Sequence, residues 1–155
     1  MRAARRPGAR VDVMADVAGD MDWLTRFSPR EWMNASMAEL GRAEAAYRRR
    51  DARGGLSGCR RAAGMAVNAI LRAMPEKAYG RTYVEHLEGL SADASVPDAV
   101  RAACRLLLDA PPPGGSLIVL RARNTPFFEA ARDVMAHAYA MVLLHAPHGQ
   151  ESESA

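Results

Sequence analysis

Four polar residues whose types could perform chemistry lie close together near the C-terminal end of the chain, at Arg132, Asp133, His137 and Tyr139. Histidine titrates near neutral pH and can exchange protons, and the planar guanidinium of arginine binds phosphate oxygens through a fixed fork of donors. Arg132 and His137 are five residues apart, which places them about 140° apart around an α-helix. The two side chains can therefore flank a groove from opposite sides, with the long arginine bending inward.

The segment that carries these residues is predicted to be a long helix from Thr125 to about His145, because Thr125 suits the N-cap and Pro126 the first helical position. One stripe of this helix is apolar and should face the core: Phe127, Ala131, Val134, Ala138, Met141 and Val142. The opposite side is also apolar, with Ala136, Ala140, Leu143 and Leu144. A helix that is apolar on nearly every side is covered on nearly every side. We expect a second copy of the chain, packed about a two-fold axis, to supply the second cover.

Other helices must position this one. A capping box at Ser28-Pro29-Arg30-Glu31 opens a helix that should run to about residue 50, where Gly54 and Gly55 are expected to end the segment. Further helices are predicted over residues 56–74, which are rich in small side chains, over 81–90, and from a capping signal at Ser95 to the prolines at 111–113. The strand-like run 117–120 is expected to be an extended loop or a helical turn. Short connections between these helices predict an all-α fold, an antiparallel bundle of four to five helices.

The chain of 155 residues has room for a single domain. We predict a flexible arm over residues 1–25, the helical domain over 26–146 and a flexible tail over 147–155; the start of the arm could also reflect an upstream start codon. Residues 1–13 hold four arginines and one aspartate, whereas the remainder holds 17 basic and 17 acidic residues. The sequence pI of about 9.2 is therefore no evidence for nucleic-acid binding.

Composition excludes several classes of protein. Arginine provides 20 of the 21 basic residues and alanine 31 residues in all, a bias that fits a GC-rich bacterial genome. Two isolated cysteines give no disulfide framework, and neither a signal peptide nor a membrane-spanning segment is evident, which predicts a soluble cytoplasmic protein. We find no spacing typical of a metal site, no glycine-rich phosphate loop and no serine or cysteine nucleophile motif. No metal or other cofactor is therefore expected.

The stretch Arg132-Asp133-Val134-Met135-Ala136-His137-Ala138-Tyr139 resembles the signature of the HEPN superfamily (higher eukaryotes and prokaryotes nucleotide-binding). In that family an arginine, a polar residue, three further residues, a histidine, one residue and a tyrosine lie on a late helix of a four- or five-helix bundle. Residues 43–53 and 56–63 are similar to the first two family helices. The resemblance covers roughly residues 29–145.

The resemblance implies a homodimer with the motif at its interface, acting on RNA and in many members as a metal-independent endoribonuclease of toxin type. It makes His137 the general acid/base on the ribose 2′-hydroxyl and Arg132 the group that stabilises the charge of the phosphorane. Asp133 would orient this pair and Tyr139 would support the site. A toxin of this kind would have a small nucleotidyltransferase-like antitoxin as its partner.

Additional candidate residues lie elsewhere in the chain. The densest basic cluster, which could grip an RNA backbone or form a solvated face, comprises Arg48, Arg49, Arg50, Arg53, Arg60 and Arg61. Arg81 and His86 repeat the arginine–histidine spacing without the polar residue after the arginine or the tyrosine. Asn68 lies among small residues, where its amide can bridge two helices or reach into the cleft; we expect the bridge.

Two plainer interpretations remain open at this level. His137 could be an ordinary histidine at the edge of a core, with Arg132 paired to Glu129 or Asp133. The chain could also be a non-catalytic helical module that binds a nucleotide or a protein partner on its small-residue or arginine-rich surface.

Overall fold

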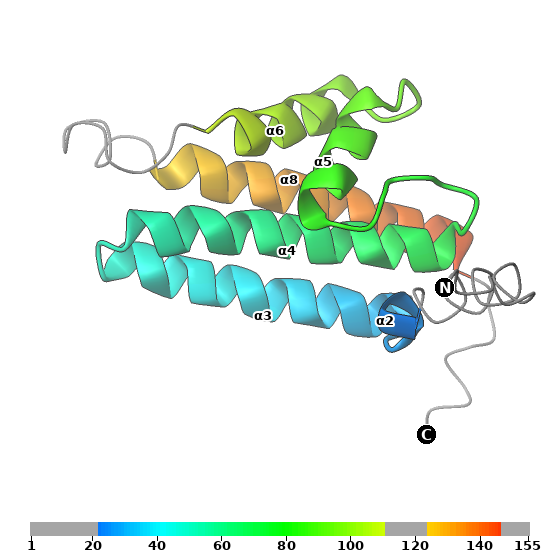
Figure 1. Cartoon of the computed structure of the whole chain (residues 1–155), viewed down its shortest axis with the longest axis horizontal. Helices are drawn as coiled ribbons and strands as arrows, with labels where there is room; N and C mark the ends of the chain where they lie inside the picture. The colour runs from blue at the N-terminus through cyan, green and yellow to red at the C-terminus, as the bar shows by residue number, and fades with distance from the viewer. Residues whose placement is uncertain (1–21, 111–123, 147–155) are drawn as a thin grey trace, which may run out of the picture.

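The computed structural model describes residues 22–110 and 124–146, and all regular structure in these ranges is helical (Figure 1). The helices are α2 (Asp22–Thr25), α3 (Pro29–Arg48), α4 (Ala52–Ala73), α5 (Tyr83–Ala92), α6 (Asp98–Asp109) and α8 (Asn124–His145). The predicted all-α class is therefore confirmed for this part of the chain. The strand-like run 117–120 and the predicted tail 147–155 lie outside the described residues.

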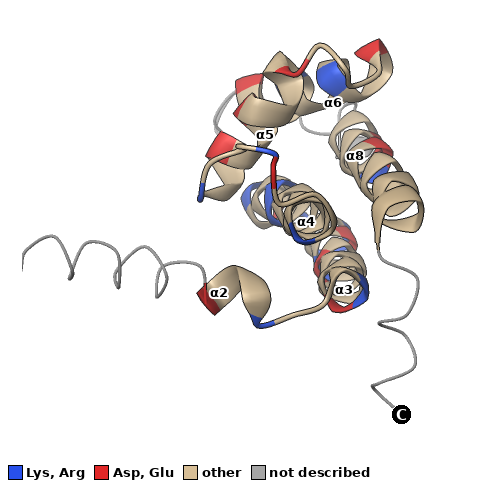
Figure 2. Ribbon diagram, turned by 90° about the vertical axis from the view of Figure 1, so that its right-hand side faces the viewer, with Lys and Arg blue, Asp and Glu red and all other residues tan. Residues whose placement is uncertain are grey.

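Helix α4 lies at the centre of the molecule, in contact with all the other described helices. Helix α3 packs along one side of α4 in the opposite direction, α8 packs along another side, and α5 and α6 lie over α4 and α8 (Figures 1 and 2). Helix α8 runs in the same direction as α4, because the chain returns through α6 before α8 begins (Figure 1). The expected antiparallel order therefore holds for α3 with α4 and for α6 with α8, but not for α4 with α8.

The predicted capping box at the start of α3 is present. The Ser28 hydroxyl accepts a hydrogen bond from the Glu31 amide at 3.1 Å, and the Glu31 carboxylate accepts one from the Ser28 amide at 3.0 Å. A second capping box, which the sequence analysis missed, begins α5 with Thr82 and Glu85. These boxes satisfy amide donors that would otherwise lack a partner at the helix start.

The connection between α3 and α4 differs from the prediction that Gly54 and Gly55 end a segment. The chain turns at Arg50, which has a φ of 62°, and α4 begins at Ala52, where the Asp51 side chain caps the Gly54 amide at 2.8 Å. Gly55 lets α4 pack closely against the Tyr47 ring of α3, since a Cβ at this position would lie 2.5 Å from that ring. Both glycines are therefore part of the helix and do not interrupt it.

Three other boundaries also differ from prediction. Residues 22–25, placed in the flexible arm, form α2, which buries Leu24 and accepts a hydrogen bond from the Trp32 indole at 2.8 Å. Helix α6 begins at Asp98 without a side-chain cap, because Ser95 instead donates hydrogen bonds to Asp93. Helix α8 begins at Asn124, one residue before the predicted N-cap.

The core is built from α4 and the inward stripe of α8. Ala131, Val134 and Ala138 are fully buried, as predicted. Both cysteines are fully buried as well, and burial raises the pKa of the Cys59 thiol to about 11 and that of the Cys104 thiol to about 12. Within the described ranges, no helix combines the length and the apolar character needed to cross a membrane.

Candidate functional site

The outward face of α8 carries the four motif residues within about two helical turns. Arg132, Asp133 and Tyr139 are exposed and His137 is half-buried. This exposure follows from the burial of the opposite stripe, because a helix that faces the core with one side must present the other side outward. The predicted site residues are therefore accessible from outside this chain.

The motif residues form two rows on this face. At about 100° per residue, Arg132 and Tyr139 lie along one edge, whereas Asp133 and His137 lie along the other edge. The exposed Ala136 and Ala140 lie between the two rows. Because alanine side chains are short, the surface between the two rows is recessed. An arginine flanks it on one side and a histidine on the other.

Large apolar side chains extend this face toward the C-terminal end of α8. The exposed fractions are 56% for Tyr139, 59% for Leu143 and 71% for Leu144. Three such side chains along one face form a surface that resembles a protein contact more than an ordinary solvated helix face.

The surroundings of His137 favour its neutral form. Burial lowers the pKa of His137 below its usual value, and the negative charge of Asp93 acts in the opposite direction. Among the described residues, neither Arg132 nor Asp133 forms an ion pair, so the pairing of Arg132 with Glu129 or Asp133 is not observed. A neutral imidazole can accept a proton, and an unpaired guanidinium can bind an anion.

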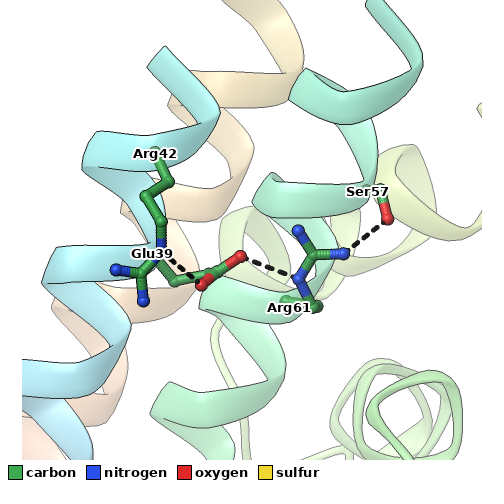
Figure 3. Close-up of polar contacts among 4 residues, drawn as sticks. All are labelled: Glu39, Arg42, Ser57 and Arg61. Atoms are coloured by element: carbon green, nitrogen blue, oxygen red, sulfur yellow. Dashed lines mark hydrogen bonds and ion pairs between the residues drawn. The ribbon is translucent and has the colours of Figure 1, made fainter. Parts of the chain in front are cut away.

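The basic cluster lies at and near the turn between α3 and α4. Three of its six arginines form hydrogen bonds or ion pairs within the chain. Arg61 donates to Glu39 at 2.7 Å and to Ser57 at 2.9 Å (Figure 3). Arg60 donates to the carbonyl oxygen of Leu107 at 2.7 Å, near the end of α6. These arginines join helices to one another, so they are less suited to grip a backbone than their sequence cluster suggests.

The other arginines of the cluster differ in their contacts. Arg48 pairs with Glu44 at 2.8 Å on the surface of α3. Arg49, Arg50 and Arg53 are exposed, and their side chains have no hydrogen-bond or ion-pair partner in the described part of the chain. Because α8 begins at the same end of the molecule as this turn (Figure 1), these three arginines and the N-terminal half of α8 belong to one end of the protein.

The second arginine–histidine match lies at the start of α5, and its histidine is inaccessible. His86 is fully buried, its Nδ1 atom lies 2.8 Å from the carbonyl oxygen of Tyr79, and its ring stacks on Trp23 at a centroid distance of 6.1 Å. Arg81 is exposed and lines an open pocket of about 440 Å³ together with Trp23, Thr82 and Glu85. His86 does not line this pocket, so the structure gives it a packing position.

Asn68 is fully buried in α4, but it does not form the expected bridge. Neither its Oδ1 nor its Nδ2 atom has a hydrogen-bond partner among the described residues. No group of three or more histidine, cysteine, aspartate or glutamate side chains in these ranges could hold a metal ion.

Asp93 is a charged residue that the sequence analysis did not single out. It follows α5, and its negative charge raises the pKa of His137 against the larger, lowering effect of burial. The Asp93-Ala94-Ser95 stretch is typical of a turn in which the aspartate accepts a hydrogen bond from the backbone amide two residues on, and this pattern is the signal in the sequence that could have identified it.

A comparison of the chain with protein-family models, with curated proteins and with solved structures gives no match.

Proposed function

We propose that the chain is a homodimeric, cytoplasmic RNA-binding protein and a metal-independent endoribonuclease, with a HEPN-like bundle of four or five helices and a site formed by Arg132 and His137 of both copies. The observation that carries this proposal is the outward face of α8, on which an unpaired arginine and a half-buried histidine flank two exposed alanines. This arrangement has the groups that RNA transesterification needs, an anion binder and a proton acceptor.

The two alanines favour packing of α8 against α8 of a second copy. Ala136 and Ala140 would let the two helices approach closely, and Tyr139, Leu143 and Leu144 would supply apolar contact area. About a two-fold axis, the arginine row of one copy can face the histidine row of the other. The shared groove would then hold two arginines and two histidines.

The proposed reaction is a transesterification in which the ribose 2′-oxygen displaces the 5′-oxygen from the adjacent phosphorus. The neutral imidazole of His137 takes the proton of a ribose 2′-hydroxyl, and the 2′-oxygen attacks the adjacent phosphorus. Arg132 binds the charge that develops on the non-bridging phosphate oxygens. The bond from phosphorus to the 5′-oxygen breaks, and this oxygen takes a proton from the imidazolium formed in the first step, which restores neutral His137. The products are a 2′,3′-cyclic phosphate and a 5′-hydroxyl.

Cleavage of a mixed RNA substrate tests the catalytic role of the two residues. His137→Ala and Arg132→Ala should each lower the cleavage rate at least about 100-fold, the lower range for general acid–base catalysis, with unchanged circular dichroism and dimer mass. His145→Ala is the matched control, since His145 is an exposed histidine of the same helix. A chelator should leave the rate unchanged. Cleavage that survives His137→Ala would contradict the catalytic role.

Sedimentation analysis of the same proteins tests the dimer. Ala136→Glu should convert the dimer to a monomer and abolish cleavage, whereas Ala102→Glu, at an exposed alanine of α6, should do neither. A dimer that persists in Ala136→Glu would show that α8 is not the interface.

The alternative is a non-catalytic module that binds a nucleotide or a protein. The observation that favours it is the use of Arg48, Arg60 and Arg61 in contacts within the chain, which leaves fewer cations for RNA. A wild-type protein that forms the dimer but cleaves no RNA at any pH would select this alternative.

A further inference from the structure

His86 of α5 is a buried histidine with one ring nitrogen that lacks a hydrogen-bond partner. Its side chain is fully buried, and its Nδ1 atom lies 2.8 Å from the carbonyl oxygen of Tyr79. Because a carbonyl oxygen can only accept, Nδ1 carries the hydrogen, and Nε2 of the neutral ring carries none. Nε2 is itself buried and has no partner among the described residues. The site therefore fits the neutral ring and offers no acceptor for the second N–H of a protonated ring.

The ring of His86 is also part of what holds α2 on the bundle. The Trp23 indole of α2 stacks on His86 at a centroid distance of 6.1 Å and an interplanar angle of 27°. The other contacts of this four-residue helix include the buried Leu24 side chain and the hydrogen bond from the Trp32 indole to the carbonyl oxygen of Leu24 at 2.8 Å. A movement of the His86 ring would therefore remove one of the contacts that keep α2 in place.

The surroundings of His86 disfavour its charged form. Burial lowers the pKa of His86 below its usual value, against opposite effects of the hydrogen bond to Tyr79 and the charge of Glu85. The exposed Glu85 carboxylate is already bound to the backbone amides of Arg81 and Thr82, at 2.7 and 3.0 Å. The neutral ring therefore stabilises the fold above the unfolded pKa of about 6.5, and this contribution is lost as the pH falls toward the lower folded pKa.

Further ionisable groups lie on the elements around α5, and none is a hydrogen-bond partner of Nε2. They are Asp22 of α2, Glu39 of α3, Arg61 of α4, Tyr79 and Arg81 before α5, and Cys104 of α6. Asp22 is exposed, and Glu39 accepts from Arg61 at 2.7 Å. Burial raises the pKa of the Tyr79 hydroxyl and of the Cys104 thiol, so both stay neutral. Arg81 is a cation, which disfavours a second positive charge nearby.

We infer that His86 is a pH-sensitive latch for α2: protonation of Nε2 displaces the ring from its site and releases α2 from the bundle. Trp23 is half-buried and contacts both His86 and the open pocket of about 440 Å³, so its displacement gives water a route to the ring. Release would open the pocket and expose apolar surface of α4 and α5 at acidic pH. The inference is independent of the proposed function.

The Trp32 indole provides a direct readout, because its N–H donates to Leu24 of α2. The chain has two tryptophans, so a ¹H–¹⁵N spectrum of the full chain contains two indole signals, and Trp23→Phe identifies that of Trp32. Between about pH 7.5 and pH 4.5, the range in which a buried histidine titrates, this signal should shift in the wild type. Trp23→Ala removes the stack and should bring the signal to its acidic position already at pH 7.5.

Two variants that cannot be protonated in this range test the role of His86. His86→Phe retains a ring beneath Trp23, and His86→Asn retains a donor for the carbonyl oxygen of Tyr79. Either variant, if folded by circular dichroism, should lose the pH-dependent shift. His145→Asn removes an exposed histidine and should keep the shift unchanged.

Three results would overturn the inference. The first is a Trp32 signal that does not move in the wild type over this range. The second is an equal shift in His86→Phe or His86→Asn. The third is a loss of most of the helical circular dichroism together with the shift, since release of the four residues of α2 alone leaves the other helices intact.

Discussion

Glu39 shows how a single buried charge is stabilised in this protein. Its side chain is 7% exposed, and its carboxylate accepts from Arg61 of α4 at 2.7 Å and from Arg42 of α3 at 3.1 Å (Figure 3). Burial by itself would raise the pKa of Glu39, but the hydrogen bonds and charges of Arg61 and Arg42 outweigh it and hold the pKa below its usual value of 4.5. The ionised carboxylate therefore links α3 to α4.

Glu39→Gln should lower the free energy of unfolding at pH 7 by about 1–2 kcal/mol, less than for a fully buried pair because both arginines are partly exposed. A group whose pKa is depressed by folding stabilises the fold above its unfolded pKa, and this contribution is lost as the pH falls through the folded pKa. The difference between wild type and variant should accordingly shrink below about pH 4.

Urea unfolding at pH 7 and pH 3.5 measures both effects. Glu44→Gln is the control, since the Glu44–Arg48 pair is exposed on both sides and should contribute little. A loss in Glu39→Gln that is equal at the two pH values would contradict the ionised link.

Sequence periodicity predicts correctly whether a side chain is buried or exposed where this depends only on its position around a helix. The 3.6-residue repeat places Val134 inside and Arg132 outside, and the structure confirms both. The repeat cannot show that Arg61 is bound to Glu39, 22 residues earlier, or that Arg60 is bound to the carbonyl oxygen of Leu107. Those contacts depend on how the helices are placed, and one sequence without its fold does not contain that information in any local pattern.

At the scale of the element, small residues in α4 set the distance between helices. A Cβ on Gly58 would lie 2.7 Å from the Cβ and 3.1 Å from the Cα of Ala43, so the two backbones meet at this glycine. Gly41 of α3 is exposed and has no atom within 4 Å of the corresponding position. The chain therefore contains two helical glycines with opposite structural roles.

Alanine substitutions at these glycines should have opposite effects on stability. Gly58→Ala should destabilise the fold by about 1–3 kcal/mol, because Ala43 is part of the opposing helix and has no flexible end that could move aside. Gly41→Ala should stabilise by about 0.5–1 kcal/mol through helix propensity. Chemical denaturation of the two variants provides the measurement, and stabilisation by Gly58→Ala would show that α3 and α4 are not in close contact there.

Two other glycines of α4, Gly54 and Gly55, show why some helix boundaries differ from those that the sequence predicts. The start of α3 is predicted correctly, because its capping box depends on Ser28 and Glu31, which lie only three positions apart. Gly54 and Gly55 were interpreted as a break, since glycine usually weakens a helix, but packing of the Tyr47 ring against Gly55 compensates. Tertiary contacts of this kind override local propensity, and the local sequence alone gives no sign of them.

At the scale of the whole molecule, the path of the chain determines which surfaces are available. Helices α5 and α6 occupy the side of α4 and α8 away from α3, so the outward face of α8 stays accessible (Figure 2). The number and approximate limits of the main helices were predictable from periodicity, capping and proline. The parallel course of α4 and α8 was not, because the direction of a helix depends on the length and route of every preceding connection.

The two cysteines give the native protein a built-in probe of its own opening. Cys59 lies in α4 and Cys104 in α6, and both thiols are shielded and held in the unreactive protonated form. An alkylating reagent should therefore modify neither thiol in the native state, and both should react at one common rate when the chain unfolds as a unit. Mass spectrometry of partly labelled protein can distinguish singly from doubly modified chains. A population labelled at Cys104 alone would show that α6 detaches while α4 remains packed, a sub-global opening that would expose part of the covered side of α8.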